Sequence, residues 1–337
     1  MTNATKTLAL LFAATVALAA ATSWDGDGAS SAAFQGRLVD VDTSAVQAIR
    51  IERSGGPTVR LRRADTTWVV APIDTGATYP AAPRAVNQLF ATLPSLQVRA
   101  VATRQPDNHP RYGVDSTGTQ VTLLGRGGET LGALIVGRTR MRRPQSQGRA
   151  QNPMQRMRRR RGGTPITYVR SPDRPDVYSV EQSLRSIARR GVDEWRDRRL
   201  WAVDRTTIQQ VDFTFPGDSS FTMRRAAPGD TASAVGPSTW VSRGDTLSSS
   251  VVSSTLQTLS SPRADAFVTG TTPESLDASQ YRVRLHLRDG SRHTLRLSPP
   301  SDGTYRAVAS GFDSVVRLQT STWAPVLRGR SAYLSDN

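Results

Sequence analysis

The clearest pattern of hydrophobic and polar positions runs from residue 46 to residue 72, where apolar side chains alternate with polar ones. Alternation with a period of two predicts strands that have one face on a core and the other in solvent. Residues 54–56, Ser-Gly-Gly, interrupt the pattern as a three-residue hairpin loop, and Trp68 follows in a third short strand. This loop predicts the cross-strand pairs Ile51/Val59, Ile49/Leu61 and Arg50/Arg60.

The period then changes to that of a helix. Apolar residues recur every three or four positions between residues 83 and 93, which predicts an amphipathic helix. A second hairpin follows, in which two alternating segments flank a glycine turn at residues 125–128. Further on, Gln182 lies three positions after Ser179, the spacing of a capping box, so we expect a short helix over residues 180–189.

The same order of elements returns in the second half of the chain. Residues 208–213 resemble residues 46–51, and Trp240 takes the place of Trp68 before another helical pattern. An internal repeat of this length predicts two copies of one structural unit. The apolar positions of the two helices match at a constant offset of 166, which pairs Val252, Leu256 and Leu259 with Val86, Phe90 and Leu93.

The hairpin over residues 281–297 has one apolar face and one arginine-rich face. With residues 289–291 as its loop, His286 points to the arginine face and His293 to the apolar face. A sheet of this kind has one side in solvent. The expected pairs are Val283/Leu297, Leu285/Leu295 and Leu287/His293 on one face, and Arg288/Arg292, His286/Thr294 and Arg284/Arg296 on the other.

These patterns together predict an α+β fold of two duplicated units, each a mainly antiparallel sheet with helices packed on one face. We place the first unit at residues 41–204 and the second at residues 205–334. The first unit contains an arginine-rich insert at residues 138–163 that the second unit lacks. Because the insert has no apolar periodicity, it is expected to be a disordered loop.

Residues 1–24 have the pattern of an export signal, with Lys6 ahead of an apolar run and alanines at a cleavage region. An uncleaved membrane anchor is the alternative, although the run is short for a spanning helix. Both place the rest of the chain outside the cytoplasm, on the periplasmic side. Residues 25–40 are rich in small residues and are expected to be a flexible linker.

Composition excludes several kinds of chemistry. The chain has no cysteine, which rules out thiol catalysis, disulfides and thiolate metal sites. Lys6 is its single lysine, so the exported part has no amine for a Walker loop, a Schiff base or a Ser-x-x-Lys acylase. No cofactor is expected.

The net charge of +16 is concentrated in one place, since ten arginines and no acid lie between residues 138 and 161. One interpretation is a solvated loop that reflects a coding bias for arginine. The other is contact with a polyanion, such as lipid headgroups, acidic glycans or an acidic protein, because guanidinium groups bind phosphate and carboxylate in pairs. The extracytoplasmic location disfavours nucleic acid. The candidate contact residues are Arg156, Arg158, Arg159, Arg160 and Arg161.

The titratable candidates each have a simpler structural interpretation. No carboxylate cluster accompanies His109, His286 or His293, so no metal site is predicted from them. Asp25 and Asp27 resemble a fragment of a calcium loop but lack the downstream glutamate, which favours a linker. Asp173 and Asp176 are explained by a turn, and the glycine turn at 125–128 lacks the helix of a phosphate-binding loop.

Two further groups of residues are candidate sites. Trp68 and Trp240 occupy equivalent places in the repeats and are best explained as core anchors, with ligand stacking as the alternative. The segment that joins the units contains an acid among arginines, and an inter-unit salt-bridge network is favoured there over a ligand site. Its members are Arg196, Asp197, Arg198 and Arg199.

The order of motifs resembles the bacterial family of domain of unknown function 4340. The motifs are the strand from Trp68 to Pro72, the sequence Tyr112-Gly113-Val114-Asp115, and the segment Trp195-Arg196-Asp197-Arg198-Arg199-Leu200 followed by Val203-Asp204. Here Trp195 and Arg198 replace the Leu and Lys of the family signature. The resemblance covers most of residues 41–268.

The resemblance implies an envelope protein with one N-terminal membrane segment, often encoded beside gliding-type ABC transporter components, without an established activity or catalytic residues. We therefore expect a non-enzymatic scaffold or accessory subunit of a membrane transport assembly. The first alternative is a periplasmic module that binds anionic glycans or lipids through the arginine-rich loop. A hydrolase with an unrecognised Asp or His site is a third hypothesis.

Overall fold

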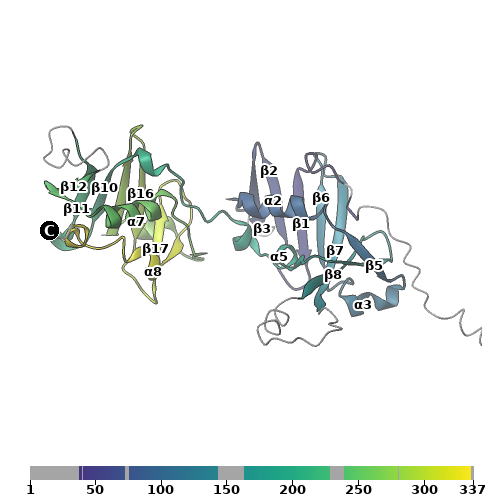
Figure 1. Ribbon diagram of the computed structural model, residues 1–337. Coiled ribbons are helices and arrows are strands. Elements are labelled where there is room, and N and C mark those ends of the chain that lie inside the picture. The colour runs from purple at the N-terminus through teal and green to yellow at the C-terminus, as the bar shows by residue number, and fades with distance from the viewer. Residues whose placement is uncertain are drawn as a thin grey trace, which may run out of the picture. The chain divides into compact units, whose positions relative to one another are not determined.

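The computed structural model describes residues 38–39, 41–72, 76–142, 163–227, 239–279 and 281–334. The chain divides into two units, one up to Val192 and one from Asp193 onward. Each unit is built on one large sheet with a few short helices, as Figure 1 shows. The predicted arrangement of two mainly antiparallel sheet units is therefore confirmed.

The first sheet has nine strands, and every pairing between them is antiparallel in the described chain. Its order is β4-β3-β2-β1-β6-β7-β8-β9-β5. The strands are β1 (Ala48–Arg53), β2 (Val59–Ala64), β3 (Thr67–Pro72), β4 (Tyr79–Pro80), β5 (Val98–Thr103), β6 (Thr119–Leu124), β7 (Thr130–Arg142), β8 (Thr164–Arg170) and β9 (Val177–Val180). The helices are α2 (Pro83–Thr92), the 3-10 turn η1 (Pro106–Asn108), α3 (His109–Tyr112) and α5 (Arg185–Ala188).

The second sheet repeats this order strand for strand, as β13-β12-β11-β10-β15-β16-β17-β18-β14. Its strands are β10 (Ile208–Thr214), β11 (Phe221–Arg225), β12 (Trp240–Ser242), β13 (Asp245–Thr246), β14 (Ala266–Phe267), β15 (Tyr281–Leu287), β16 (Arg292–Leu297), β17 (Thr304–Ala309) and β18 (Val316–Gln319). The helical segments are α6 (Val192–Trp195), η2 (Arg205–Thr207), η3 (Gly217–Ser219), α7 (Ser249–Ser260), η5 (Pro273–Leu276), α8 (Thr320–Trp323) and η6 (Arg330–Tyr333). The repeat read from the sequence thus has the same topology twice.

The pairing of the first hairpin is confirmed. β1 and β2 place Ile49 opposite Leu61 and Ile51 opposite Val59. The pairing of the second hairpin was predicted wrongly, because Val283 lies opposite Leu295 rather than Leu297. Leu287 donates its N–H to the carbonyl of Ser291 over 3.0 Å, so the loop begins one residue earlier than expected. A shift of two residues leaves each side chain on its predicted face.

The predicted helix over residues 83–93 is confirmed as α2, which buries Ala85, Val86 and Leu89. α2 contacts β3, where the ring centres of Phe90 and Trp68 are 5.4 Å apart. The helix expected over residues 180–189 is present only as α5 (Arg185–Ala188), and its predicted start is wrong, since Ser179 and Val180 end strand β9. Ser179 donates its hydroxyl to the carbonyl of Ala100 in β5 at 3.2 Å instead of capping a helix.

The second core is continuous and aromatic. Trp240, Leu256 and Leu259 belong to it, so the predicted core role of Trp240 fits its 5 % exposure. Phe213 stacks on Phe221 with ring centres 4.7 Å apart. The C-terminal segment closes the core, because Tyr333 is fully buried and accepts a hydrogen bond from Thr255 and donates one to the carbonyl of Val326, at 3.1 and 2.7 Å.

Two predicted boundaries are altered by the fold. Leu200 and Trp201 pack in the second core, so residues 193–204, assigned above to the first unit, fall in the second. The insert predicted as disordered from residue 138 instead begins as strand, because β7 continues to Arg142, which pairs with Thr164. Residues 143–162 of the insert lie outside the described residues, as do residues 1–24 and the export signal expected there. In the parts of the chain that are described, no helix has the length and apolar character needed to cross a bilayer.

One glycine in the first sheet allows a close approach of backbone segments. A Cβ at Gly137 of β7 would lie 2.4 Å from the carbonyl oxygen of Tyr112 and 2.9 Å from that of Gly113. Gly113 itself ends α3 in the left-handed conformation at φ 66°. The glycine in β7 is therefore what lets the end of α3 lie against the sheet.

Candidate functional site

Polar side chains gather on the outer face of the second sheet. Val211, Val283 and Leu295 point into the main core, so the residues that alternate with them point to the opposite face. Strands β10, β15 and β16 are adjacent in the order of the sheet, which brings these polar residues together. They are Gln210, Asp212, Arg282, Arg284, His286, Thr294 and Arg296.

A histidine and an aspartate form the most ordered contact on this face. His286 Nε2 lies 2.6 Å from Asp212 Oδ2, and each side chain is 25 % exposed. The other carboxylate oxygen, Oδ1, accepts hydrogen bonds from Gln210 Nε2 at 2.7 Å and Thr222 Oγ1 at 2.9 Å. All three donors come from neighbouring positions of β10, β11 and β15, so sheet pairing fixes the geometry.

These contacts set the protonation state of the carboxylate. Partial burial by itself raises the pKa of Asp212, but hydrogen bonds from Gln210, His286 and Thr222 outweigh it and hold the pKa below its ordinary value of 3.8. Asp212 is therefore ionised at neutral pH and orients the imidazole of His286. Because an ionised carboxylate can only accept a hydrogen bond, Nε2 of His286 carries a proton and donates it to Asp212.

The His286–Asp212 pair has two of the three parts of a hydrolase triad. In such triads the carboxylate holds one ring nitrogen while a nucleophilic hydroxyl meets the other. Within the described chain no hydroxyl bonds Nδ1 of His286, and the nearby Thr222 bonds Asp212 instead. The described residues also contain no group of three or more His, Asp or Glu suited to a metal ion. The arrangement can bind and orient a polar group.

Two hollows lie along this face and share Arg284 in their walls. One has a volume of about 550 Å³ and is bounded by Asp212, Thr222 and Arg224. The other, of about 340 Å³, lies between β15, β16 and the end of β17. It is lined by Arg282, Arg284, Thr294, Arg296 and Ser310.

The first unit does not repeat this constellation. The matched cross-strand pairs Ile51/Val121 and Phe213/Val283 align the two sheets residue by residue. By this alignment Asp212 corresponds to Arg50, and His286 corresponds to Leu124. The pair is therefore a property of the second unit and not a requirement of the fold.

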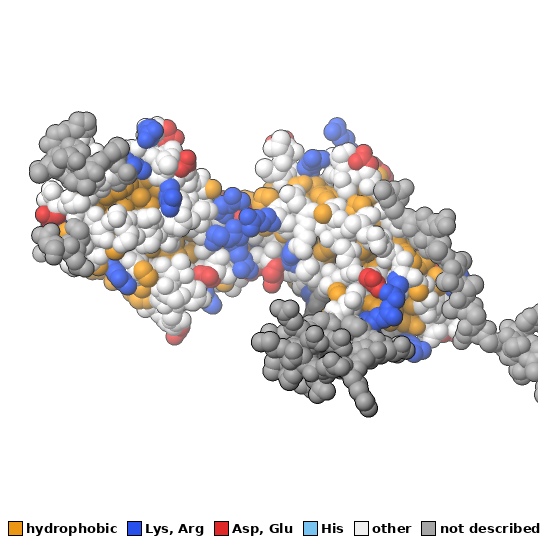
Figure 2. Space-filling model, viewed as in Figure 1, with side chains coloured by type: hydrophobic (Ala, Val, Ile, Leu, Met, Phe, Trp, Pro, Cys, Tyr) orange, Lys and Arg blue, Asp and Glu red, His pale blue; other side chains and the backbone are white. Residues whose placement is uncertain are grey.

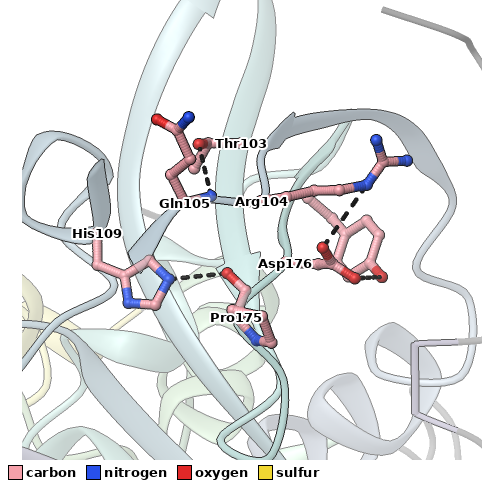
Figure 3. Close-up of polar contacts among 7 residues, drawn as sticks. Thr103, Arg104, Gln105, His109, Pro175 and Asp176 are labelled. Carbon is pink, nitrogen blue, oxygen red and sulfur yellow. Dashed lines mark hydrogen bonds and ion pairs between the residues drawn. The ribbon is translucent and has the colours of Figure 1, made fainter. Parts of the chain in front are cut away.

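His109 has a structural role in the first unit. Its Nε2 lies 2.8 Å from the carbonyl oxygen of Pro175, which ties α3 to the turn between β8 and β9, as Figure 3 shows. Beside it, Asp176 accepts a hydrogen bond from the hydroxyl of Tyr178 at 3.3 Å and lies 3.8 Å from Nε of Arg104. The turn here lies at residues 172–173, so Asp173 is within it and Asp176 lies beyond it, which differs from the turn expected between the two acids. This network fastens loops together.

His293 is packed against the second core. Its ring stacks on Trp201 with centres 5.2 Å apart, and the indole of Trp201 donates to the carbonyl of Leu259 at 2.8 Å. Burial lowers the pKa of His293, and the charge of Asp289 opposes this effect only in part. His286 and His293 thus lie on opposite faces of the hairpin, as predicted.

The residues proposed as an inter-unit network lie within the second unit, and their contacts described here are to other parts of it. The guanidinium of Arg196 lies 3.4 Å from the ring centre of Phe267 and donates to Ser314 Oγ at 2.6 Å. Arg198 donates to the carbonyl of Asp265 at 2.9 Å. Asp197 accepts from the backbone N–H of Arg199 at 3.0 Å and lies 3.6 Å from its guanidinium. These contacts fasten the start of the second unit to its own sheet.

The remaining candidates fall outside the described residues or in turns. Arg156, Arg158, Arg159, Arg160 and Arg161 lie outside the described residues, and so do Asp25 and Asp27. The glycine turn at residues 125–128 joins two strands, and the carboxylate of Glu129 accepts the N–H of Gly127 at 2.8 Å. The N–H of Gly127 is therefore already bonded within the turn.

Asp212 was missed in the sequence because its partner is distant. His286 lies 74 positions further along the chain, so no local spacing joins the two. The usable signal was a lone acid at an outward position of β10, opposite a hairpin whose outward positions are basic. Once β10 and β15 are recognised as neighbours, this acid is the expected partner of His286.

Comparison with known proteins identifies one family. No curated protein and no solved structure matches the chain. Residues 161–304 match the family described as Domain of unknown function (DUF4340). The matched range contains the signature at residues 195–200 but not the Trp68 and Tyr112 motifs. The match, which covers less than half of the chain, reaches from the first unit into the second.

Proposed function

We propose that this protein is a non-enzymatic accessory subunit that holds partners of an envelope transport assembly on the extracytoplasmic side of the membrane. The best support is that the same nine-stranded sheet occurs twice, with different side chains on its outer face in each copy. Outward positions that hold Gln120, Thr122 and Ile135 in the first sheet hold Arg282, Arg284 and Arg296 in the second. One scaffold with two different surfaces suits the recognition of two partners.

The link to transport rests on the resemblance to a family whose members are often encoded beside gliding-type ABC transporter components. The location rests on the export-signal pattern of residues 1–24. We further propose that α2 and α7 cover corresponding faces of the two sheets, which leaves the opposite faces for binding. Supporting this, Phe90 of α2 contacts Trp68, and Val252, Leu256 and Leu259 of α7 pack in the second core.

The surface supports binding more than a deep catalytic pocket. Figure 2 shows basic and apolar side chains interspersed over the visible face of both units. Interfaces are commonly enriched in arginine beside apolar area, since the guanidinium combines planar contact with several donors. The alternative function, binding of anionic glycans or lipids through the arginine-rich insert, uses a separate part of the chain and is tested alongside.

The test is affinity purification from membranes with a variant that lacks residues 143–162. Because Arg142 pairs with Thr164, a short turn in place of the deleted residues keeps the β7–β8 hairpin closed. The scaffold proposal expects the same partners to co-purify with the variant and with the full chain. Complete loss of the partners would contradict it.

The same variant tests the alternative. Binding through the insert predicts salt-sensitive attachment to anionic liposomes or acidic glycans, because exposed charges are screened by salt. That attachment should disappear in the variant while circular dichroism remains unchanged. Attachment that persists in the variant would rule out the insert as the binding element.

A further inference from the structure

We propose that the smaller hollow on the second sheet is a binding site for a phosphate-type oxyanion, held by the guanidinium groups of Arg282, Arg284 and Arg296. The hollow has a volume of about 340 Å³, which accommodates a phosphoryl group with part of its carrier. Thr294 and Ser310 place hydroxyl groups in the same wall. The site is separate from the arginine-rich insert and does not depend on the proposed transport role.

The arrangement of the arginines favours a bound anion. Arg282 lies directly opposite Arg296 in the β15–β16 pairing, and Arg284 follows on the same face. Like charges directly opposite one another destabilise a sheet. The carboxylate of Asp277 pairs with Arg296, but in the described chain no hydrogen bond or ion pair joins Arg282 or Arg284 to a side chain. An oxyanion between the three would relieve this repulsion.

Arg282 is also incompletely satisfied. Its Nε is buried from solvent and has no hydrogen-bond partner among the described residues. A buried donor without a partner costs stability, and in native structures such a donor is often explained by an unseen ligand or water. Guanidinium groups bind phosphate through two parallel N–H donors, and Nε–H is one of those that can take part.

Solvation by water can explain how other opposed arginines of this sheet are tolerated, but it explains these three less well. Arg306 and Arg317 also lie opposite each other on the outer face, but both are exposed, so water screens them. By contrast Arg282, Arg284 and Arg296 are only partly exposed. The first sheet carries Gln120, Thr122 and Ile135 at the three corresponding positions, so the fold itself does not require basic residues there.

Asp212 and His286 lie on the same face beside Arg284, outside the lining of this hollow. Asp212 lies opposite Arg284 in the β10–β15 pairing, but its oxygens are taken by Gln210, Thr222 and His286. The carboxylate is therefore held back from the arginine. This leaves the guanidinium of Arg284 available to a ligand.

The test uses the first sheet as a template. The double variant R282Q/R284T introduces the residues that the first sheet carries at the same register, Gln120 and Thr122, so the sheet is expected to tolerate them. The double variant R306Q/R317Q is the matched control, since it also removes two opposed arginines from the same face. Binding of inorganic phosphate is measured by calorimetry in the full chain at constant ionic strength, with chloride as the reference salt.

We expect phosphate to bind the wild-type chain and R306Q/R317Q equally, and R282Q/R284T at least about tenfold more weakly, since each lost charged hydrogen bond is worth about that factor. Without phosphate, R282Q/R284T should unfold at the same temperature as the wild type or higher, because repulsion is removed. Equal phosphate affinity in all three proteins would overturn the proposal. So would a phosphate response no larger than that to chloride.

A second pair of probes identifies the carrier of the phosphoryl group. Glycerol 3-phosphate represents a soluble phosphomonoester, and phosphatidylcholine vesicles that contain phosphatidic acid represent a lipid headgroup. Stronger binding of either probe than of inorganic phosphate, lost in R282Q/R284T and kept in R306Q/R317Q, supports the site and assigns its source. If R282Q/R284T and R306Q/R317Q weaken the binding of both probes equally, the binding depends only on general surface charge. That result would overturn the proposal.

Discussion

At the scale of single residues, the second sheet shows how one carboxylate organises a polar surface. Asp212 accepts hydrogen bonds from three side chains on three strands while remaining only partly exposed. A carboxylate with several donors is strongly favoured in its ionised form. Asp212 therefore stabilises the outer face besides orienting His286.

We predict that D212N lowers the free energy of unfolding at pH 7 by about 1–3 kcal/mol, the usual cost of disturbing hydrogen bonds to a partly buried charge. The folded-state pKa of Asp212 is lowered below its ordinary value of 3.8. Its contribution is thus present above that value and is lost as the pH falls through the folded pKa. Denaturant unfolding of both proteins should show a difference that shrinks below about pH 4.

The control for this change is D107N, since Asp107 is exposed. It should alter stability by no more than about 0.5 kcal/mol. A D212N effect that is as small, or that grows on acidification, would show that the hydrogen bonds of Asp212 do not stabilise the fold.

At the scale of elements, Gly137 gives a test of how α3 is held. A methyl group at this position would meet the carbonyl oxygens of Tyr112 and Gly113, which are backbone atoms and cannot swing away. We predict that G137A lowers the free energy of unfolding by about 1–3 kcal/mol, the range for overpacking. Thermal unfolding followed by circular dichroism measures this change.

Gly329 provides the matched glycine control. Nothing lies within 4 Å of a Cβ built there, and its φ of −66° suits any residue. G329A should therefore leave stability unchanged or raise it slightly, because alanine restricts the unfolded chain. If the two alanine variants melt at the same temperature, the close approach of α3 to β7 has no energetic importance.

The sequence predicted elements well where one periodic pattern dominated. Alternation identified the β1–β2 hairpin with its residue pairs, and helical spacing identified α2. The slip in the β15–β16 pairing did not change which face each histidine occupies, because two residues are one full period of a strand. Local patterns thus determine faces more securely than pairings.

The elements that were missed depend on distant partners. β5 pairs with β9, and β14 has only two residues and pairs with β18, so neither is marked by local periodicity. Ser179 has the spacing of a capping box, yet the ladder to β5 and β8 decides its conformation. For the same reason only half of the candidate site could be predicted, since the hairpin pattern places His286 on the polar face but nothing local indicates Asp212.

At the scale of the whole molecule, the division into units gives a prediction about fragments. The second unit includes residues 193–204, which pack Leu200 and Trp201 into its core. We predict that a fragment of residues 193–337 unfolds in one cooperative transition. A fragment that begins at residue 205 should be less stable by about 3–5 kcal/mol, the cost of losing a buried tryptophan.

Urea unfolding followed by tryptophan fluorescence and circular dichroism compares the two fragments. The 193–337 fragment with the substitution W201A serves as an intermediate case, since it lacks the indole but keeps the backbone contacts of residues 198–203 with residues 260–264. Equal stability of the fragments would place these residues outside the second unit and restore the boundary expected from the sequence.

The pairing of Arg142 with Thr164 has a consequence for how this chain can change over time. Partners in an antiparallel ladder lie about 5 Å apart, so the two ends of the intervening segment meet whatever its length. Doubling such a segment costs only about 0.6 kcal/mol in closure entropy. Its length and composition can therefore drift, or come under selection of their own, with little effect on folding. The tip of the β7–β8 hairpin is a permissive position where evolution, or an experimenter, can graft new sequence.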